Sequence, residues 1–218
     1  MRLLPAPEKQ SITRRQAFSL VELMVVMVII GILGALIAGV VVKAVSAQRT
    51  STTLTTMEVI KSGLSRQLQE ISDAARKAGK SKKEIYILVR QAFPDSLNTG
   101  PSSPVNIDGE RITVSVYPAY NNLIAANSGQ LATMVDDKSS TMVEKKSSFL
   151  LRMILDKGPK SKIDTDQLPK GALGLINGVN AVLDAWGDPI GVSILIDLND
   201  PNLKVDFRLS SPNATLKN

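Results

Sequence analysis

The stretch RRQAFSLVELMVVMVIIGIL, residues 14–33, joins a pair of arginines to a long apolar run. Residues 23–42 contain no charged side chain, no proline and three glycines. As a helix, these 20 residues would be roughly 30 Å long, which is the thickness of the hydrocarbon core of a bilayer. The pattern predicts a helix that crosses a membrane near the N-terminus. One carboxylate, Glu22, stands directly before the run, where a plain anchor has no use for a charge.

Two ordinary interpretations fit part of this pattern. A cleaved secretory signal needs a basic start, about 7–15 apolar residues and a site of small residues. Residues 45–47 (Val-Ser-Ala) would provide that site and leave Gln48 as the first residue, but the apolar run is longer than such signals use. A plain single-span anchor fits the length and leaves Glu22 unexplained.

The segment QAFSLVELMVVMVIIGILGAL, residues 16–36, resembles the N-terminal signature of type IV prepilins and of type II secretion pseudopilins. That signature is a short basic leader, a small residue, a phenylalanine, a glutamate four residues later and a transmembrane helix. The resemblance implies that a prepilin peptidase cuts between Ala17 and Phe18 and then methylates the new amino group of Phe18. This chain departs from the pattern at Ala17, where the family usually has glycine.

The resemblance gives Glu22 a role. A charge deep in a bilayer costs about 2.5–3.5 kcal/mol on insertion scales, but Glu22 lies only about 6 Å along the helix from Phe18 and stays near the interface. Cleavage creates a positive amine on Phe18. When such helices pack together, Glu22 of one subunit is expected to pair with that amine on a neighbour, because a paired buried charge is tolerated and sets the register.

Small residues recur every four positions along the same helix, at Gly31, Ala35 and Gly39. This spacing places them on one face, where it lets helices approach closely. We therefore expect this face to be a packing surface between copies of the chain.

The periodicity of apolar residues continues beyond the run. It predicts that the helix extends amphipathically through residues 43–79, with Gly79 just after its end. The predicted organisation is a leader (1–17), a transmembrane assembly helix (18–42), its amphipathic continuation (43–79) and an α+β head (80–218). A long N-terminal helix packed on a small head with antiparallel strands is the pilin-like fold that the resemblance implies.

Orientation follows from charge. The leader carries four basic residues against one acid, a net charge of +3 out of +6 for the chain. Basic flanks stay in the cytoplasm. We therefore expect a single-pass protein of the cytoplasmic membrane with its N-terminus inside and its head periplasmic or extracellular.

The head combines helix and strand signals. Ser81 and Glu84 form a capping-box pattern before a helix that Pro94 stops. Asp108-Gly109 between apolar residues predicts a hairpin. Further expected elements are helices over 123–135 and 149–155, the second ended by Gly158-Pro159, and antiparallel strands over 192–197 and 203–209.

Composition removes much of the catalytic repertoire. The chain has no cysteine and no histidine, which excludes disulfides, thiolate nucleophiles, Ser-His-Asp triads and histidine-ligated metals. No phosphate-binding glycine loop is present, so we expect no enzymatic activity. The small cluster Lys80, Lys82 and Lys83 has no interleaved aromatic residues, and we expect no nucleic-acid partner.

The segment DAWGDPIG, residues 184–191, resembles the Asp-x-Trp-Gly-x-Pro segment near the C-terminal strands of major pseudopilins. Its residues predict a tight turn with a large aromatic side chain beside it. In the family, acids of this region can bind calcium; the alternative is solvated turn acids. A second acidic stretch, 164–166, opens like a calcium loop, but Leu168 breaks it. The oxygen donors available for calcium are Asp184, Asp188, Asp197, Asn199 and Asp200.

The resemblance implies a filament subunit whose partners are copies of itself, other pilin-like subunits, the prepilin peptidase, the assembly platform of the inner membrane and the bilayer. Within the family, the 184–191 segment favours a type II secretion pseudopilus over an adhesive pilus. About 100 head residues precede that segment, more than compact major pseudopilins need, so a minor or lineage-specific pilin is the next alternative within the family. The alternatives are a membrane-anchored binding protein that never polymerises and a secreted soluble protein.

Overall fold

The computed structural model describes residues 19–94, 97, 104–137, 140–159, 165–200 and 203–215. Internal contacts divide the chain into two compact units, which meet in sequence between Val45 and Ser46. Helix α1, Leu20–Lys77, contributes to both.

Within the second unit, α1 buries one stripe of side chains at spacings of three and four residues, as an amphipathic helix does. After Lys77 the helix closes with a Schellman motif, in which the Gly79 amide donates to the Arg76 carbonyl and the Lys80 amide to the Ala75 carbonyl. Gly79 has φ +68°, a conformation that favours glycine. The predicted helix end at Gly79 is therefore confirmed. The buried stripe is Thr53, Thr56, Met57, Ile60, Leu64, Gln67, Ile71 and Ala75.

Helix α2, Lys82–Ala92, begins with the predicted capping box. The Ser81 hydroxyl accepts from the Glu84 amide, and the Glu84 carboxylate accepts from the Ser81 amide. These bonds from Ser81, together with the ammonium of Lys80, lower the pKa of Glu84 to about 2. The three lysines of the small cluster all have partners: Lys80 pairs with Glu84, Lys83 with Glu110, and Lys82 donates to the Leu198 carbonyl.

Two tight hairpins follow. Strands β1, Val105–Ile107, and β2, Glu110–Ile112, pair antiparallel as predicted, with both turn residues, Asp108-Gly109, at positive φ. Strands β3, Leu173–Ile176, and β4, Val179–Val182, form a second hairpin around Asn177-Gly178. The sequence prediction missed this one, although Asn-Gly is a strong hairpin signal.

Two helix predictions were wrong in their bounds. The helix expected over 123–135 is two shorter ones, α3, Pro118–Ala126, and α4, Ser128–Ala132, because Pro118 starts the first and Asn127 interrupts the run. The helix expected over 149–155 is α5, Met142–Lys157. It starts seven residues earlier because Thr141 and Glu144 form a capping box, and it ends at Gly158 as expected.

The C-terminal part of the head is a three-stranded antiparallel sheet in the order β5-β6-β7. Strand β5, Gly191–Ile196, pairs with β6, Val205–Ser211, which confirms the two predicted strands. The short β7, Ala214–Thr215, was not predicted. A single 3₁₀ turn, Thr165–Gln167, precedes β3 among the described residues.

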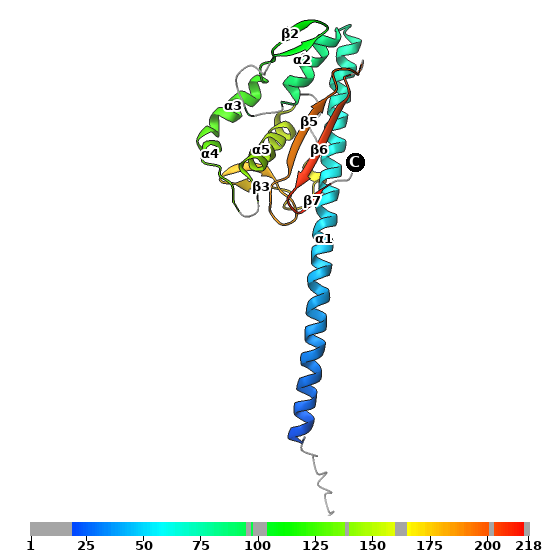
Figure 1. Ribbon diagram of the computed structural model, residues 1–218, viewed down its shortest axis with the longest axis vertical. Coiled ribbons are helices and arrows are strands. Elements are labelled where there is room, and N and C mark those ends of the chain that lie inside the picture. Colours follow the sequence, from blue (N-terminus) through cyan, green and yellow to red (C-terminus); the bar gives the residue numbers. More distant parts are fainter. Residues whose placement is uncertain are drawn as a thin grey trace, which may run out of the picture. The chain divides into compact units, whose positions relative to one another are not determined.

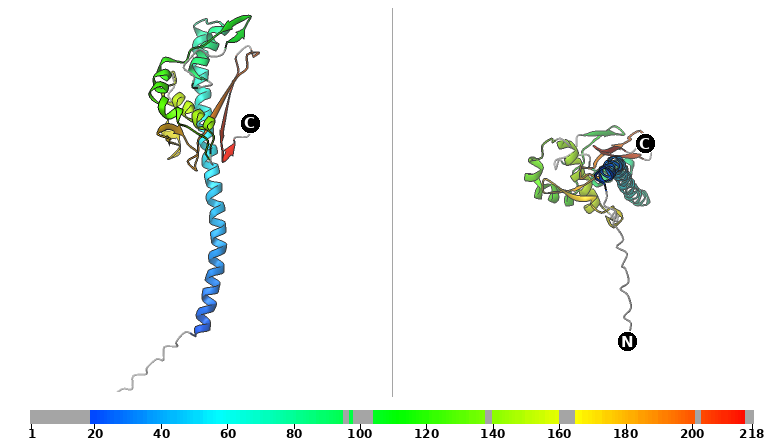
Figure 2. Two further views of the ribbon diagram at one scale, coloured as in Figure 1. Left: turned by 60° about the vertical axis from the view of Figure 1, so that its left-hand side comes forward. Right: turned by 90° about the horizontal axis from the view of Figure 1, so that it is seen from below.

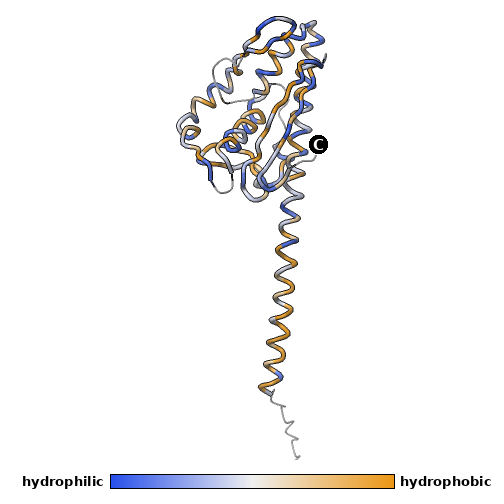
Figure 3. The backbone as a smooth tube through the Cα atoms, viewed as in Figure 1, coloured by the Kyte–Doolittle hydropathy of each residue, from blue (hydrophilic) through white to orange (hydrophobic). Residues whose placement is uncertain are grey.

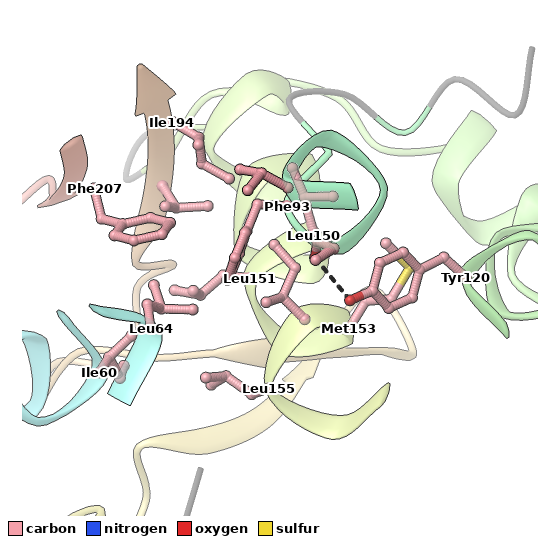
Figure 4. Packing of buried hydrophobic residues seen from close by; sticks show 14 of the residues in the cluster. Ile60, Leu64, Phe93, Tyr120, Leu150, Leu151, Met153, Leu155, Ile194 and Phe207 are labelled. Carbon is pink, nitrogen blue, oxygen red and sulfur yellow. Dashed lines mark hydrogen bonds between the residues drawn. The ribbon is translucent and has the colours of Figure 1, made fainter. Parts of the chain in front are cut away.

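Helix α5 lies at the centre of the head. In Figures 1 and 2 it lies between α1 and the pair formed by α3 and α4. Figure 4 shows the apolar core around it, with Ile60 and Leu64 from α1, Phe93 after α2 and Phe207 from β6. The Tyr120 hydroxyl is buried in this core and donates to the Ala92 carbonyl. Burial raises the pKa of Tyr120 above its usual value.

Two serines of α5 form hydrogen bonds to backbone groups at the edges of β4 and β5. The Ser148 hydroxyl donates to the Val182 carbonyl of β4 and accepts from the Val182 amide. The Ser147 hydroxyl makes the same two bonds with Val192 of β5. The hairpin β3–β4 and the sheet β5-β6-β7 are thereby joined through a helix, and this positions the loop between β4 and β5.

Candidate functional site at the start of the N-terminal helix and in the turn after β4

The start of α1 is closed by a reciprocal pair of hydrogen bonds. The Ser19 amide donates to the Glu22 carboxylate at 2.9 Å, and the Glu22 amide donates to the Ser19 hydroxyl at 3.2 Å. This is the geometry of a capping box, with Ser19 as the N-cap and Glu22 three residues into the helix. Glu22 thus has a partner within its own chain. The sequence pattern Ser-x-x-Glu carries this signal, but the prediction assigned Glu22 only to a neighbouring subunit.

The predicted cut site lies directly before this cap. Ala17 and Phe18 lie outside the described residues, so cleavage and methylation there stay predictions. The cap bears on both steps, because after a cut at that position Phe18 would be the only residue before the N-cap Ser19. In sequence, the new amino group would be directly before the N-cap Ser19 and four residues before Glu22, whose carboxylate accepts from the Ser19 amide.

Residues 20–45 of α1 expose large apolar side chains on every side. Figure 3 shows this part of the helix as hydrophobic almost throughout. None of its most apolar window is buried against the rest of the chain, which distinguishes it from the core helix of a soluble protein. By length and composition the helix can cross a membrane, a property that N-terminal signal sequences share.

Among the residues that the structure describes, none packs against the glycines of this helix. A Cβ atom placed on Gly31 or Gly39 would meet no other atom within 4 Å. Gly31, Ala35 and Gly39 lie on one face of a continuous helix. Their role as a packing surface between copies stays a prediction.

The turn after β4 is built around one buried carboxylate. Asp184 is 4% exposed. Its Oδ1 accepts from the amides of Trp186 and Asp188 at 2.8 and 2.9 Å. Its Oδ2 accepts from the side chains of Ser211 and Asn213 at 3.0 and 2.9 Å. Gly187, at φ +91°, lets the chain reverse. The expected tight turn is confirmed, and Asp184 ties it to the end of β6.

The same turn also contacts α1. The amide of Ala185 donates to the hydroxyl of Thr53 at 3.1 Å, and Thr53 is fully buried. Trp186 is half-buried beside it and lines a groove of about 280 Å³ together with Thr52 and Thr56. The turn therefore fixes the head against the amphipathic part of α1.

The five oxygen donors considered for calcium fall into two separate turns. Asp184 and Asp188 precede β5, whereas Asp197, Asn199 and Asp200 follow it. The strand between them is six residues long, roughly 17 Å, so the structure does not bring them together. Asp197 accepts from the Asn199 amide, and Asp184 already accepts four hydrogen bonds. Within the described ranges, no group of three or more acidic residues is arranged to hold a metal ion.

Comparison with known proteins gives one match. A model of the prokaryotic N-terminal methylation motif matches residues 12–38, which include Ala17, Phe18 and Glu22. This is the prepilin-type signature, and the chain carries it at its N-terminus. Neither the comparison with curated proteins nor that with solved structures found a match.

Proposed function

We propose, from the premise that this chain carries the prepilin-type methylation signature, that it is a structural subunit of a pilus-like filament. The chain would be inserted with its leader inside, cut between Ala17 and Phe18, methylated on Phe18 and then drawn from the membrane into a fibre. The observation that carries the proposal is an apolar helix that begins after the N-cap Ser19, has Glu22 in its first turn and exposes residues 20–45 on all sides.

The exposed helix supports assembly as well as anchoring. A helix that only crosses a bilayer needs apolar side chains, and residues 23–42 provide them. It does not need three glycines at which an added side chain would meet no described residue, because each glycine weakens a helix by about 1 kcal/mol relative to alanine. Close packing between helices explains them. In the fibre, residues 20–45 of α1 would form the apolar core and the head the outer surface.

Proteins with this signature are structural subunits, and we propose a mechanical role here too. Among filaments, the turn of residues 184–189 favours a type II secretion pseudopilus, because it resembles the corresponding segment of major pseudopilins. The prepilin peptidase, other pilin-like subunits and the inner-membrane assembly platform are the partners that this role requires.

Because Glu22 is part of a capping box, a test must separate its role as a helix cap from its charge. Glutamine also completes a capping box, so Glu22→Gln keeps the helix start and removes only the charge. Glu22→Ala removes both. The full chain and both variants would be expressed with a prepilin peptidase and an assembly system, and processing and filament yield would be measured separately.

We expect all three proteins to be cut before Phe18, and both variants to lose filament assembly. If Glu22→Gln assembles like the wild type while Glu22→Ala does not, Glu22 acts as a helix cap and the charge pair between subunits is wrong. Filament formation by both variants at the wild-type level would remove Glu22 from the assembly mechanism. Absence of filaments in the wild type despite correct processing would favour an anchored protein that does not polymerise.

A further inference from the structure

The outer edge of β5 has backbone groups that pair with no described residue. In the β5–β6 register, the Asp197 amide donates to the Lys204 carbonyl, so alternate residues back along β5 face β6. Val192, Ile194 and Ile196 therefore point their amides and carbonyls to the other side. Ser147 satisfies those of Val192. For Ile194 and Ile196, no described residue does.

A groove runs beside this open edge. It measures about 400 Å³ and lies between one face of α5 and the start of β5. The face of α5 that lines it repeats at three and four residues, with Val143, Lys146 and Leu150. Val143 is 69% exposed at its rim. The remaining apolar walls are Leu97, Val192 and Ile194.

The charge in the groove has no partner in the described chain. Lys146 forms no ion pair with any described residue, whereas the adjacent Lys145 is buried against Asp137. A ligand for this groove thus needs three features: a backbone that can pair with a strand edge, apolar side chains and a carboxylate.

From this juxtaposition we propose that the β5 edge and the α5 groove bind an extended peptide segment of a partner protein by strand addition. The segment has aliphatic side chains at alternate positions and an acidic residue that pairs with Lys146. Main-chain bonds to Ile194 and Ile196 supply affinity, and the groove supplies specificity. The free part of β5, residues 194–196, covers about 10 Å, which matches three residues of an extended peptide. This interaction goes beyond filament assembly and does not depend on it.

The test uses the full chain in detergent micelles and a fluorescein-labelled hexapeptide in which valine and threonine alternate around a central glutamate. Fluorescence anisotropy measures binding. One control peptide has N-methylated backbone amides at alternate positions, which blocks strand pairing and leaves the side chains unchanged. A second replaces the glutamate by lysine.

Two variants complete the design. Val143→Glu fills the rim with a charge; because position 143 is in the first turn of α5, an acid there favours the helix, and the fold is retained. Lys146→Glu reverses the charge of the groove. Melting temperatures of both variants verify that the fold is intact.

We expect saturable binding of the glutamate peptide to the wild type and none of the N-methylated peptide. Val143→Glu should abolish binding. Lys146→Glu should weaken binding of the glutamate peptide by roughly 3- to 10-fold and strengthen binding of the lysine peptide, since an ion pair at the surface contributes modestly to affinity. Equal binding of the N-methylated peptide, or no saturable binding of either charged peptide, overturns the proposal. A change in oligomeric state with Val143→Glu, without peptide binding to the wild type, assigns the groove to a second copy instead.

Discussion

Replacing Asp184 by alanine should destabilise the head more than any other single change in the turn of residues 184–189. The substitution removes an acceptor of four hydrogen bonds and leaves the amides of Trp186 and Asp188 without partners. A buried donor left unpaired costs about 1–3 kcal/mol, so the loss should be roughly 3 kcal/mol. For a chain of this length, that lowers the melting temperature by about 6–12 °C.

Trp186 is the only tryptophan and lies inside the affected turn, so its fluorescence reports the transition directly. Asp197→Ala is the matched control: Asp197 is also a turn aspartate, but it is exposed and accepts one bond. It should change stability by about 0.5 kcal/mol or less. Asp184→Asn keeps one acceptor oxygen and should fall between the two. If Asp184→Ala melts within 2 °C of the wild type, the buried network does not hold the turn.

The same protein samples test calcium. Because the oxygens of Asp184 are already occupied by hydrogen bonds, millimolar calcium should leave the melting temperature of the wild type unchanged. A calcium-dependent rise that Asp188→Asn removes would contradict this and would make the turn a metal site.

Three further predictions concern other parts of the chain. The pKa of Glu84 is about 2 in the folded chain and about 4.3 in the unfolded chain, so the stability that its carboxylate contributes is complete above pH 5 and is lost as the pH falls toward 2. The difference in melting temperature between the wild type and Glu84→Gln should therefore shrink over that pH range. A constant difference would contradict the capping role. Ser148→Ala leaves the Val182 amide unpaired in the core and should lower the free energy of unfolding in urea by about 1–3 kcal/mol. Ser147→Ala, at a half-buried site, should lower it by less. The reverse order would show that water replaces the buried hydroxyl. Gly39→Leu should leave the melting temperature and membrane insertion of the chain unchanged but reduce filament yield, because a side chain at position 39 would meet no described residue; normal filaments would remove this face from assembly.

Local signals predicted the parts of the fold that depend on neighbouring residues. The Schellman end at Gly79, the capping box at Ser81 and the Asp108-Gly109 hairpin each need only a few adjacent residues, and each is present. The Thr141–Glu144 capping box and the Asn177-Gly178 turn carried equally local signals that the prediction overlooked.

Other features depend on residues far apart in sequence and could not be predicted from one chain. Asp184 meets Ser211 and Asn213 only because β6 returns beside the turn. The bonds from Ser147 and Ser148 to two different strands require α5 to lie between them. At the N-terminus, the apolar helix and Glu22 could be identified from the sequence, because membrane insertion depends on composition and length, which a single sequence contains.

If this chain is a prepilin, as we propose, its mature N-terminus must carry the mark of the prepilin peptidase. Full-length protein would be isolated from membranes of its native cell and its N-terminal peptide measured by mass spectrometry. We expect a chain that begins at Phe18 and carries one methyl group on its amine. A chain that still begins at Met1, or one that begins at Gln48 after an ordinary signal cleavage, would contradict it.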